Sequence, residues 1–298
     1  MKALDRPILR WHGGKWRLAP WIIGHFPPHR VYVEPFGGAA SVLMRKPRLW
    51  AECYNDLDGD VVNVFQVLRD RVAAADLRAR LALTPFARAE FDATYKPAAD
   101  PIDAAHKTIV RSFMGHGSDS VSRSCRTGFR AKMSDNRAFA SQAWSNYADA
   151  VPFFCERLQG VLIEQRDARE VMTRLDGVDT LHYVDPPYMI ATRSSLAGGR
   201  GATHGYRHEL TDDDHDTLLE FLDGLRGYVV LSGYPSEDYD RALGHWRRVE
   251  MRALADGAKE RTEVLWINPA CAAALDAQAG GLGMPLFGVL DDAREAAE

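Results

Sequence analysis

Four consecutive residues, Asp185-Pro186-Pro187-Tyr188, could hold a flat base that carries an exocyclic amine. The carboxylate of Asp185 and the carbonyl of Pro186 can each accept one hydrogen of such an amine, and the ring of Tyr188 can stack on the base. The two prolines make this corner rigid, because neither can continue a β-ladder or enter the interior of a helix. An ordinary loop start has the same composition, so the tetrapeptide alone leaves both interpretations open.

The corner follows residues 181–184, an apolar run that predicts a short buried strand. Ligands of open α/β sheets bind beyond the carboxyl ends of the strands. We therefore expect the carboxylate of Asp185 to stand where a ligand would bind.

A glycine-rich loop follows another predicted strand, residues 31–33. Its sequence, Glu34-Pro35-Phe36-Gly37-Gly38, lets the backbone bend sharply and approach a ligand closely. The loop lacks the G-x-G-x-x-G spacing of the dinucleotide fingerprint and the Lys-Ser/Thr pair of a P-loop. Asp56, after the predicted strand 51–54, could bond ribose hydroxyls, although an acid in this position is also a common turn residue.

Two further segments could contact a ligand. The loop Trp11-His12-Gly13-Gly14-Lys15 could clamp a small polar group, and Asp167, beyond the predicted strand 161–163, could accept a hydrogen from the amine of an adenine. A surface turn and a solvated loop acid are the alternative interpretations.

The order of these elements is typical of a doubly wound α/β sheet. Residues from about 70 to 157 differ, because their helical stretches are broken by prolines and show no alternating strand pattern. We expect one domain from residues 1–69 and 158–298 and an inserted, mainly helical subdomain from residues 70–157. Further strands are predicted at 228–231 and 264–267, and helices at 40–45, 60–80, 169–175 and 211–225.

The composition is that of an ordinary globular protein, with 46% hydrophobic and 26% charged residues among 298. No apolar run approaches the roughly 18 residues of a membrane span, and the N-terminus lacks the apolar stretch of a signal peptide, so a cytoplasmic location is expected. The four cysteines contain no C-x-x-C pair, which argues against a zinc site and a disulfide framework. No metal is expected.

Basic residues are concentrated in two stretches, although the formal net charge is −4. Residues 107–137 contain seven basic residues and two acids, and residues 189–208 contain three arginines and no acid. Such stretches predict a face that contacts phosphate.

The chemical segments occur in one order with strand-compatible spacing. In this order the chain resembles the Dam-type DNA adenine-N6 methyltransferases (D12 class, alpha group). The resemblance covers both ends of the chain, through residues 261–268, and is weakest in the middle. It implies a Rossmann-like methyltransferase sheet with an inserted DNA-recognition subdomain, S-adenosylmethionine as methyl donor and double-stranded DNA as partner.

The resemblance also implies which residues form the sites. Trp11 and Lys15 would line the cofactor pocket, Asp56 would hold the ribose, Asp167 the cofactor adenine, and Asp185 would lie between cofactor and target amine. The implied cofactor-binding residues are Trp11, Lys15, Glu34, Pro35, Phe36, Gly37, Gly38, Asp56, Asp167 and Asp185; the implied catalytic residues are Asp185, Pro186, Pro187 and Tyr188; and the expected DNA-binding residues are Arg123, Arg126, Arg130, Lys132, Arg193, Arg200 and Arg207.

The chain departs from the family pattern at two positions. His12 stands where a small residue is common, and Ala40 stands where the family often has the second glycine of a G-x-G. Alanine is small enough that we expect the loop to keep its shape. We also expect residues 189–208 to form a mobile loop that orders on DNA.

Alternatives remain open from the sequence. N4-cytosine methyltransferases use the same kind of corner, usually with serine in place of the first aspartate, so Asp185 favours adenine. A DNA-binding protein that has lost catalysis, and a methyltransferase acting on RNA or protein, are the other candidates. A monomer and a homodimer on a palindromic site are both compatible with the sequence, and the recognition sequence is not predicted.

Overall fold

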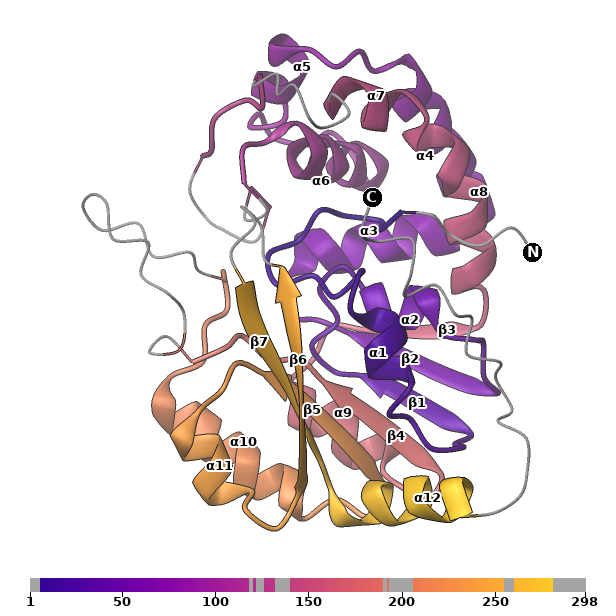
Figure 1. Ribbon diagram of the computed structural model, residues 1–298. Helices are drawn as coiled ribbons and strands as arrows, with labels where there is room; N and C mark the ends of the chain where they lie inside the picture. Colours follow the sequence, from indigo (N-terminus) through magenta and orange to yellow (C-terminus); the bar gives the residue numbers. More distant parts are fainter. Residues whose placement is uncertain are drawn as a thin grey trace.

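The computed structural model describes residues 6–117, 120–121, 126–131, 140–189, 192, 206–254 and 260–280. Within these residues, seven strands form one sheet that helices cover on both faces (Figure 1). The strands are β1 (Val31–Glu34), β2 (Ala51–Asn55), β3 (Val161–Glu164), β4 (Thr180–Val184), β5 (Tyr228–Gly233), β6 (Arg247–Leu254) and β7 (Glu260–Ile267).

The strand order is β3-β2-β1-β4-β5-β7-β6. The strands from β3 to β5 are parallel, whereas β7 runs antiparallel to both β5 and β6. The six predicted strands are all present, which confirms the expected doubly wound α/β fold. Strand β6 was not predicted, because its sequence RRVEMRAL lies at the sheet edge with largely exposed charged residues and has no apolar run.

The helices were predicted less completely than the strands. The prediction of a single helix over 60–80 is wrong in one respect, because two helices meet at Asp70. The carboxylate of Asp70 accepts hydrogen bonds from the N–H groups of Val72 and Ala73 and caps the second helix.

Within the described ranges, no helix is long and apolar enough to cross a membrane. The helices are α1 (Ala19–Ile23), α2 (Ser41–Arg45), α3 (Gly59–Arg69), α4 (Arg71–Leu83), α5 (Arg88–Ala93), α6 (Pro101–Met114), α7 (Ala140–Ser145), α8 (Tyr147–Leu158), α9 (Ala168–Leu175), α10 (Asp212–Asp223), α11 (Glu237–Ala242) and α12 (Pro269–Gly280).

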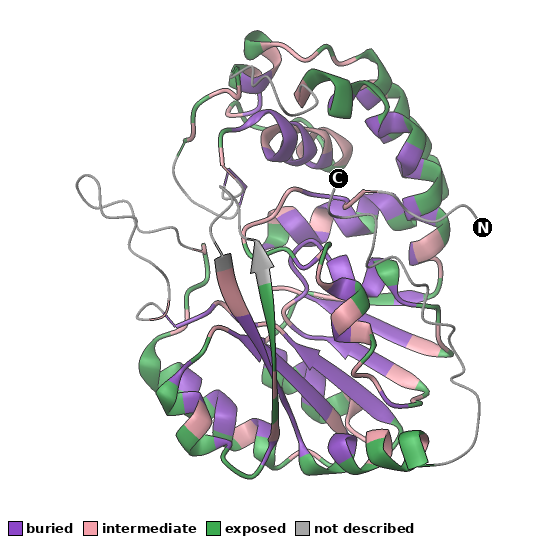
Figure 2. Cartoon of the chain, viewed as in Figure 1, coloured by how far each residue is buried: buried purple, intermediate pink, exposed green. Residues whose placement is uncertain are grey.

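Alternate side chains of the strands build two hydrophobic layers, as the period of two in a strand requires. Tyr32 and Tyr183 pack on one face of the sheet in a large cluster, and Val33 and Val184 pack on the other with residues of α9, α10 and α11. The central strands are accordingly buried, while the outer surfaces of the covering helices are exposed (Figure 2).

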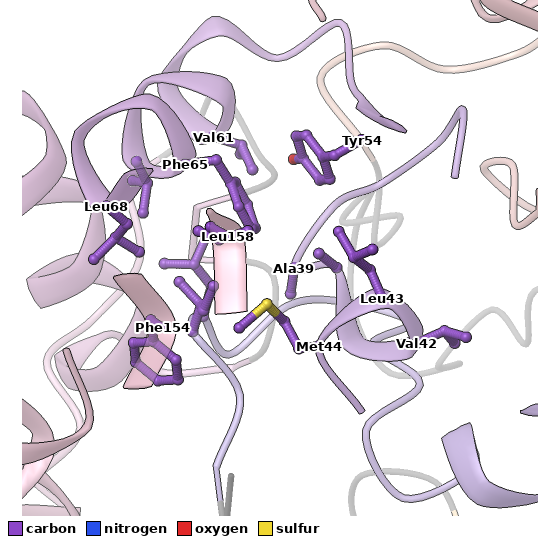
Figure 3. Close-up of a cluster of buried hydrophobic side chains, with 14 of the residues drawn as sticks. Ala39, Val42, Leu43, Met44, Tyr54, Val61, Phe65, Leu68, Phe154 and Leu158 are labelled. Carbon is purple, nitrogen blue, oxygen red and sulfur yellow. The ribbon is translucent and has the colours of Figure 1, made fainter. Parts of the chain in front are cut away.

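Helices α4 to α8 occupy the segment predicted as a helical insert. The described residues from 70 to 157 contain no strand, only an isolated bridge between Gly115 and Phe129. These helices lie together at one end of the molecule, above α3 (Figure 1). Phe154 and Leu158 of α8 join the cluster formed by Phe65 of α3 and residues of α2 (Figure 3). The helical segment therefore shares its core with the sheet region, and the predicted domain boundaries stay a prediction.

A buried ionic group also joins α8 to the sheet. Glu52 of β2 accepts from Lys46 Nζ at 2.7 Å and from Arg157 Nη1 at 2.7 Å. Burial alone raises the pKa of Glu52, but the two cations outweigh it and hold that pKa below its usual value. Each charge in this group is compensated, as buried charges must be.

The direction of the sheet order reverses between β1 and β4. Strand β1 pairs with β2 on one side and with β4 on the other. A crevice at the carboxyl ends of two such strands is where ligands of doubly wound sheets bind. Glu34 ends β1 and Asp185 directly follows β4, so both acids lie at this switch point.

Candidate active site

A pocket opens at the switch point, and every residue that the sequence assigned to the cofactor lines it. These residues come from five separate segments of the chain, and the parallel strands bring them to one edge of the sheet. Among the pocket-lining residues are Trp11, Lys15, Glu34, Pro35, Phe36, Gly37, Gly38, Asp56, Asp167 and Asp185.

The glycine loop has its shape because two of its positions have no room for a side chain. A Cβ on Gly37 would lie 2.1 Å from the ring of Tyr54. A Cβ on Gly38 would lie 2.6 Å from Trp11 Nε1, and Gly38 has a φ of +47°, which disfavours other residues. The Gly38 N–H donates to Asp56 Oδ2 at 2.8 Å, so the loop and the acid after β2 fix one another.

Ala40 keeps the loop shape but adopts a conformation that suits glycine. Its φ of 51° and ψ of 38° are in the left-handed region, and it is the one described non-glycine residue with positive φ. The departure from the family's G-x-G thus falls on a backbone position where alanine is strained.

Lys15 is the buried cation at the centre of the site. Its side chain is 4% exposed, and Nζ lies 3.0 Å from Asp185 Oδ1 and donates to the Gly13 carbonyl at 2.6 Å. Nζ also lies over the ring of Tyr188, 4.7 Å from its centroid. Burial lowers the pKa of Lys15, but the charges of Asp185 and Glu263 outweigh it and raise that pKa above its usual value. Lys15 therefore stays charged.

Two residues that complete the corner were missed in the sequence. Ser232 of β5 donates its hydroxyl to Asp185 Oδ1 at 2.7 Å, and Glu263 of β7 accepts from the Tyr188 hydroxyl at 3.0 Å. Both are buried, at 1% and 9% exposure. Burial raises the pKa of Glu263, and Lys15 opposes this shift. The signal available in the sequence was a polar residue directly after the predicted strand 228–231 and another directly before the predicted strand 264–267.

The four residues of the corner differ in their access to the pocket. Asp185 and Pro187 line it, whereas Pro186 and Tyr188 are buried and do not. The ring of Tyr188 meets the edge of Tyr234, with centroids 4.6 Å apart and an interplanar angle of 76°. Tyr188 is thus held by Lys15, Glu263 and Tyr234 together.

Glu34 is a buried acid in the pocket wall. Its Oε2 accepts hydrogen bonds from the Tyr32 hydroxyl at 2.7 Å and from the Leu43 N–H at 2.9 Å. Burial nevertheless raises the pKa of Glu34 to about 8, and burial also raises the pKa of Asp56. Several carboxyl groups thus line the pocket wall, and such groups can accept hydrogen bonds from the amine and hydroxyl groups of a ligand.

Residues 206–210 form another part of the pocket wall. The Tyr206 hydroxyl donates to the His12 carbonyl at 3.3 Å. Arg207 Nη1 donates to Asp58 Oδ1 at 2.9 Å and to Asp60 Oδ2 at 3.0 Å. The predicted DNA-binding residue Arg207 is thus paired with two acids beside the pocket.

Two of the other predicted DNA-binding residues, Arg126 and Arg130, lie in the described part of the helical segment. Arg126 is exposed, pairs with Asp92 at 2.5 Å and lies 4.7 Å from the ring centroid of Tyr95. Arg130 is half-buried, and its N–H donates to the Met114 carbonyl at 2.7 Å. Arg123, Lys132, Arg193 and Arg200, with most of the expected mobile loop at 189–208, lie outside the described residues.

Comparison with known proteins gives the family. Residues 11–240 match the family described as D12 class N6 adenine-specific DNA methyltransferase. The DNA adenine methylase of Escherichia coli (strain K12) is 23% identical over 270 residues, which cover 86% of this chain and 92% of that protein. The DNA adenine methylase of Vibrio cholerae serotype O1 (strain El Tor Inaba N16961) is 26% identical over 247 residues, which cover 80% and 84%. The chain therefore belongs to the D12 class of N6 adenine-specific DNA methyltransferases.

Proposed function

We propose that this adenine-specific DNA methyltransferase acts on an adenine flipped out of duplex DNA, with S-adenosylmethionine as methyl donor and Asp185-Pro186-Pro187-Tyr188 as the catalytic corner. The observation that carries the proposal is the position of Asp185, at the sheet's switch point and beside a pocket with several carboxyl groups. S-Adenosylmethionine supplies an electrophilic sulfonium methyl group when bound.

The acids of the pocket fit this cofactor, since it bears positive charge on sulfur and on its amine and presents ribose hydroxyls. Trp11 and Lys15 would line its pocket, the loop at Phe36-Gly37-Gly38 would wrap its methionine part, Asp56 would hold the ribose and Asp167 the adenine.

The amine of adenine is a poor nucleophile, because its lone pair is delocalised into the ring. Asp185 and the Pro186 carbonyl would each accept a hydrogen bond from one N–H group of this amine. These two hydrogen bonds would favour a pyramidal nitrogen whose lone pair points at the methyl group. The carboxylate of Asp185 would also stabilise the positive charge that develops on this nitrogen, and the methylated amine would become neutral by releasing one of its two protons to solvent. Positioning and electrostatic stabilisation are thus the protein's contributions.

A paired adenine cannot reach this corner inside a duplex. Flipping it out costs a few kcal/mol. Stacking on the ring of Tyr188 would return about 1–3 kcal/mol once a bound base takes the place of Lys15 on the ring face. Phosphate contacts from the basic helical segment, with Arg126 and Arg130 among the described residues, would hold the duplex. Both a monomer and a homodimer on a palindromic site are compatible with this proposal.

Methyl transfer to unmethylated genomic DNA tests the proposal. The protein is incubated with labelled S-adenosylmethionine, and modified bases are mapped by single-molecule sequencing. N6-methyladenine at one short motif is the expected result, and Asp185→Ala should lower the transfer rate by about 10³-fold or more while DNA affinity stays within about threefold. N4-methylcytosine would contradict the assigned base, and absence of cofactor binding would favour a DNA-binding protein without catalysis.

A further inference from the structure

We propose that Ser232 is a positioning residue for methyl transfer: its hydroxyl helps fix one carboxylate oxygen of Asp185 and leaves the other oxygen to accept the target amine. This proposal rests on the proposed role of Asp185 in the transfer. It assigns a task to a residue outside the Asp-Pro-Pro-Tyr corner.

The hydrogen bonds on Asp185 are distributed unequally between its two oxygens. Ser232 Oγ donates to Oδ1 at 2.7 Å, and Lys15 Nζ lies 3.0 Å from the same oxygen. Among the described residues, none donates a hydrogen bond to Oδ2. The carboxylate is therefore held at one oxygen and available at the other.

The sheet register brings Ser232 to this position. Strands β4 and β5 are parallel, with Tyr183 opposite Val230 and Val184 opposite Leu231. Asp185 and Ser232 are the next residues on the two strands, so their side chains meet at the carboxyl end of the sheet. Ser232 is 1% exposed, which keeps water from replacing its hydroxyl.

The direction of the hydrogen bonds follows from the chemistry of the partners. The Ser232 hydroxyl has one proton and lies between Asp185 Oδ1 and the Tyr183 hydroxyl, 3.2 Å away. Because Ser232 donates this one proton to Asp185, it can only accept from the Tyr183 hydroxyl. Tyr183 thus fixes the rotation of the serine hydroxyl, and the serine fixes the carboxylate.

Two donors on Oδ1 restrain the rotation of the carboxylate about its Cβ–Cγ bond. With Lys15 as its single donor, the carboxylate of Asp185 would be free to turn about the ammonium group, because the three N–H groups of lysine can donate in many geometries. Because a misplacement of about 1 Å can lower a rate about 10²-fold, loss of the second donor should slow transfer without weakening the binding of either substrate.

Three substitutions separate the hydrogen bond from packing. Ser232→Ala removes the donor, Ser232→Cys fills the same space with a weak donor, and Ser232→Thr keeps a hydroxyl. Single-turnover methylation, equilibrium binding of S-adenosylmethionine and of duplex DNA, and thermal unfolding are measured for each. Ala and Cys should both slow the single-turnover rate about 10- to 100-fold with both dissociation constants within about threefold, and Thr should be faster than either.

Tyr183→Phe and Asp185→Ala are the controls. Tyr183→Phe keeps the Ser232–Asp185 bond, so its rate should fall less than that of Ser232→Ala. A wild-type rate for Ser232→Cys beside a slow Ser232→Ala would assign packing instead and overturn the proposal, as would a wild-type rate for Ser232→Ala. If Asp185→Ala is inactive while Ser232→Ala is fully active, only this inference fails; if Asp185→Ala stays active, the proposed function itself fails.

Discussion

The Tyr188 hydroxyl donates a 3.0 Å hydrogen bond to Glu263 Oε2 and thereby joins the corner after β4 to the antiparallel strand β7. The two residues are 75 positions apart in the chain. Lys15 lies over the same tyrosine ring, so the ring is fixed by a carboxylate at its edge and an ammonium group at its face. This arrangement separates the tasks of the hydroxyl and of the ring.

Replacing Tyr188 tests that separation. Tyr188→Phe leaves Glu263 without this donor and should lower the free energy of unfolding by about 1–3 kcal/mol, with little effect on the transfer rate. Tyr188→Ala also removes the ring, so binding of an extrahelical adenine should weaken by about 1–3 kcal/mol. Urea unfolding and the fluorescence of duplexes with 2-aminopurine at the target base measure the two effects. Equal base binding by Phe and Ala variants would argue against stacking on this ring.

Ala40→Gly should stabilise the protein. Glycine tolerates the φ of 51° that strains alanine, so the midpoint of urea unfolding should rise by an amount equivalent to about 1 kcal/mol. Ala39→Gly is the matched control, since Ala39 is not among the residues with positive φ, and it should destabilise by about 0.5–1 kcal/mol. A loss of stability in both variants would contradict the strain at Ala40.

The buried carboxyl of Glu34 should make stability depend on pH. Its pKa is about 8 in the folded protein and 4.5 as the ordinary value, so between these values the native state binds a proton that the unfolded state releases. Stability from this group therefore falls as pH rises from about 4.5 to 8 and is fully lost above 8. Glu34→Gln keeps an acceptor for Tyr32 and Leu43 but cannot ionise. Its unfolding free energy should thus change less between pH 5 and 8 than that of the wild type, for which this one group can give a slope of at most about 1.4 kcal/mol per pH unit. Parallel curves would refute the assignment.

Arg207→Ala should weaken cofactor binding. Burial raises the pKa of Asp58 and Arg207 opposes that shift, so removing the arginine leaves a buried acid uncompensated and frees the pocket wall at 206–210. Release of S-adenosylmethionine in stopped-flow experiments should accelerate about tenfold, or 1.4 kcal/mol. Arg174→Ala, which removes an exposed partner of Glu164, is the control.

The same variant examines the sequence prediction that Arg207 contacts DNA. A phosphate contact would instead weaken DNA binding without changing cofactor release, and would reduce the salt dependence of DNA affinity by about one unit of slope. The two outcomes exclude one another as the main role of this side chain.

The local features of this fold were predictable from sequence, and the long-range partners were not. Apolar runs predicted β1 to β5 and β7. Gly37 and Gly38 predicted the tight loop, in which the rings of Tyr54 and Trp11 leave no room for a side chain at these two positions. Edge strand β6 has no apolar run to reveal it. Ser232 and Glu263 reach the site through the pairing of β4 with β5 and of β5 with β7. The register of a strand pair cannot be predicted from the sequence of one strand by itself.

The ionic group at Glu52 limits how much of the helical segment could be replaced by that of a related enzyme in order to change the DNA specificity. Arg157 belongs to α8, the last helix of the segment predicted to recognise DNA, yet its guanidinium neutralises a carboxylate of the sheet and donates to the Leu43 carbonyl. A transplant of the whole segment would remove that cation and leave Glu52 to Lys46 alone. A recombination junction placed before α8 keeps Arg157, Phe154 and Leu158 with their own scaffold, so the exchangeable unit is smaller than the helical insert.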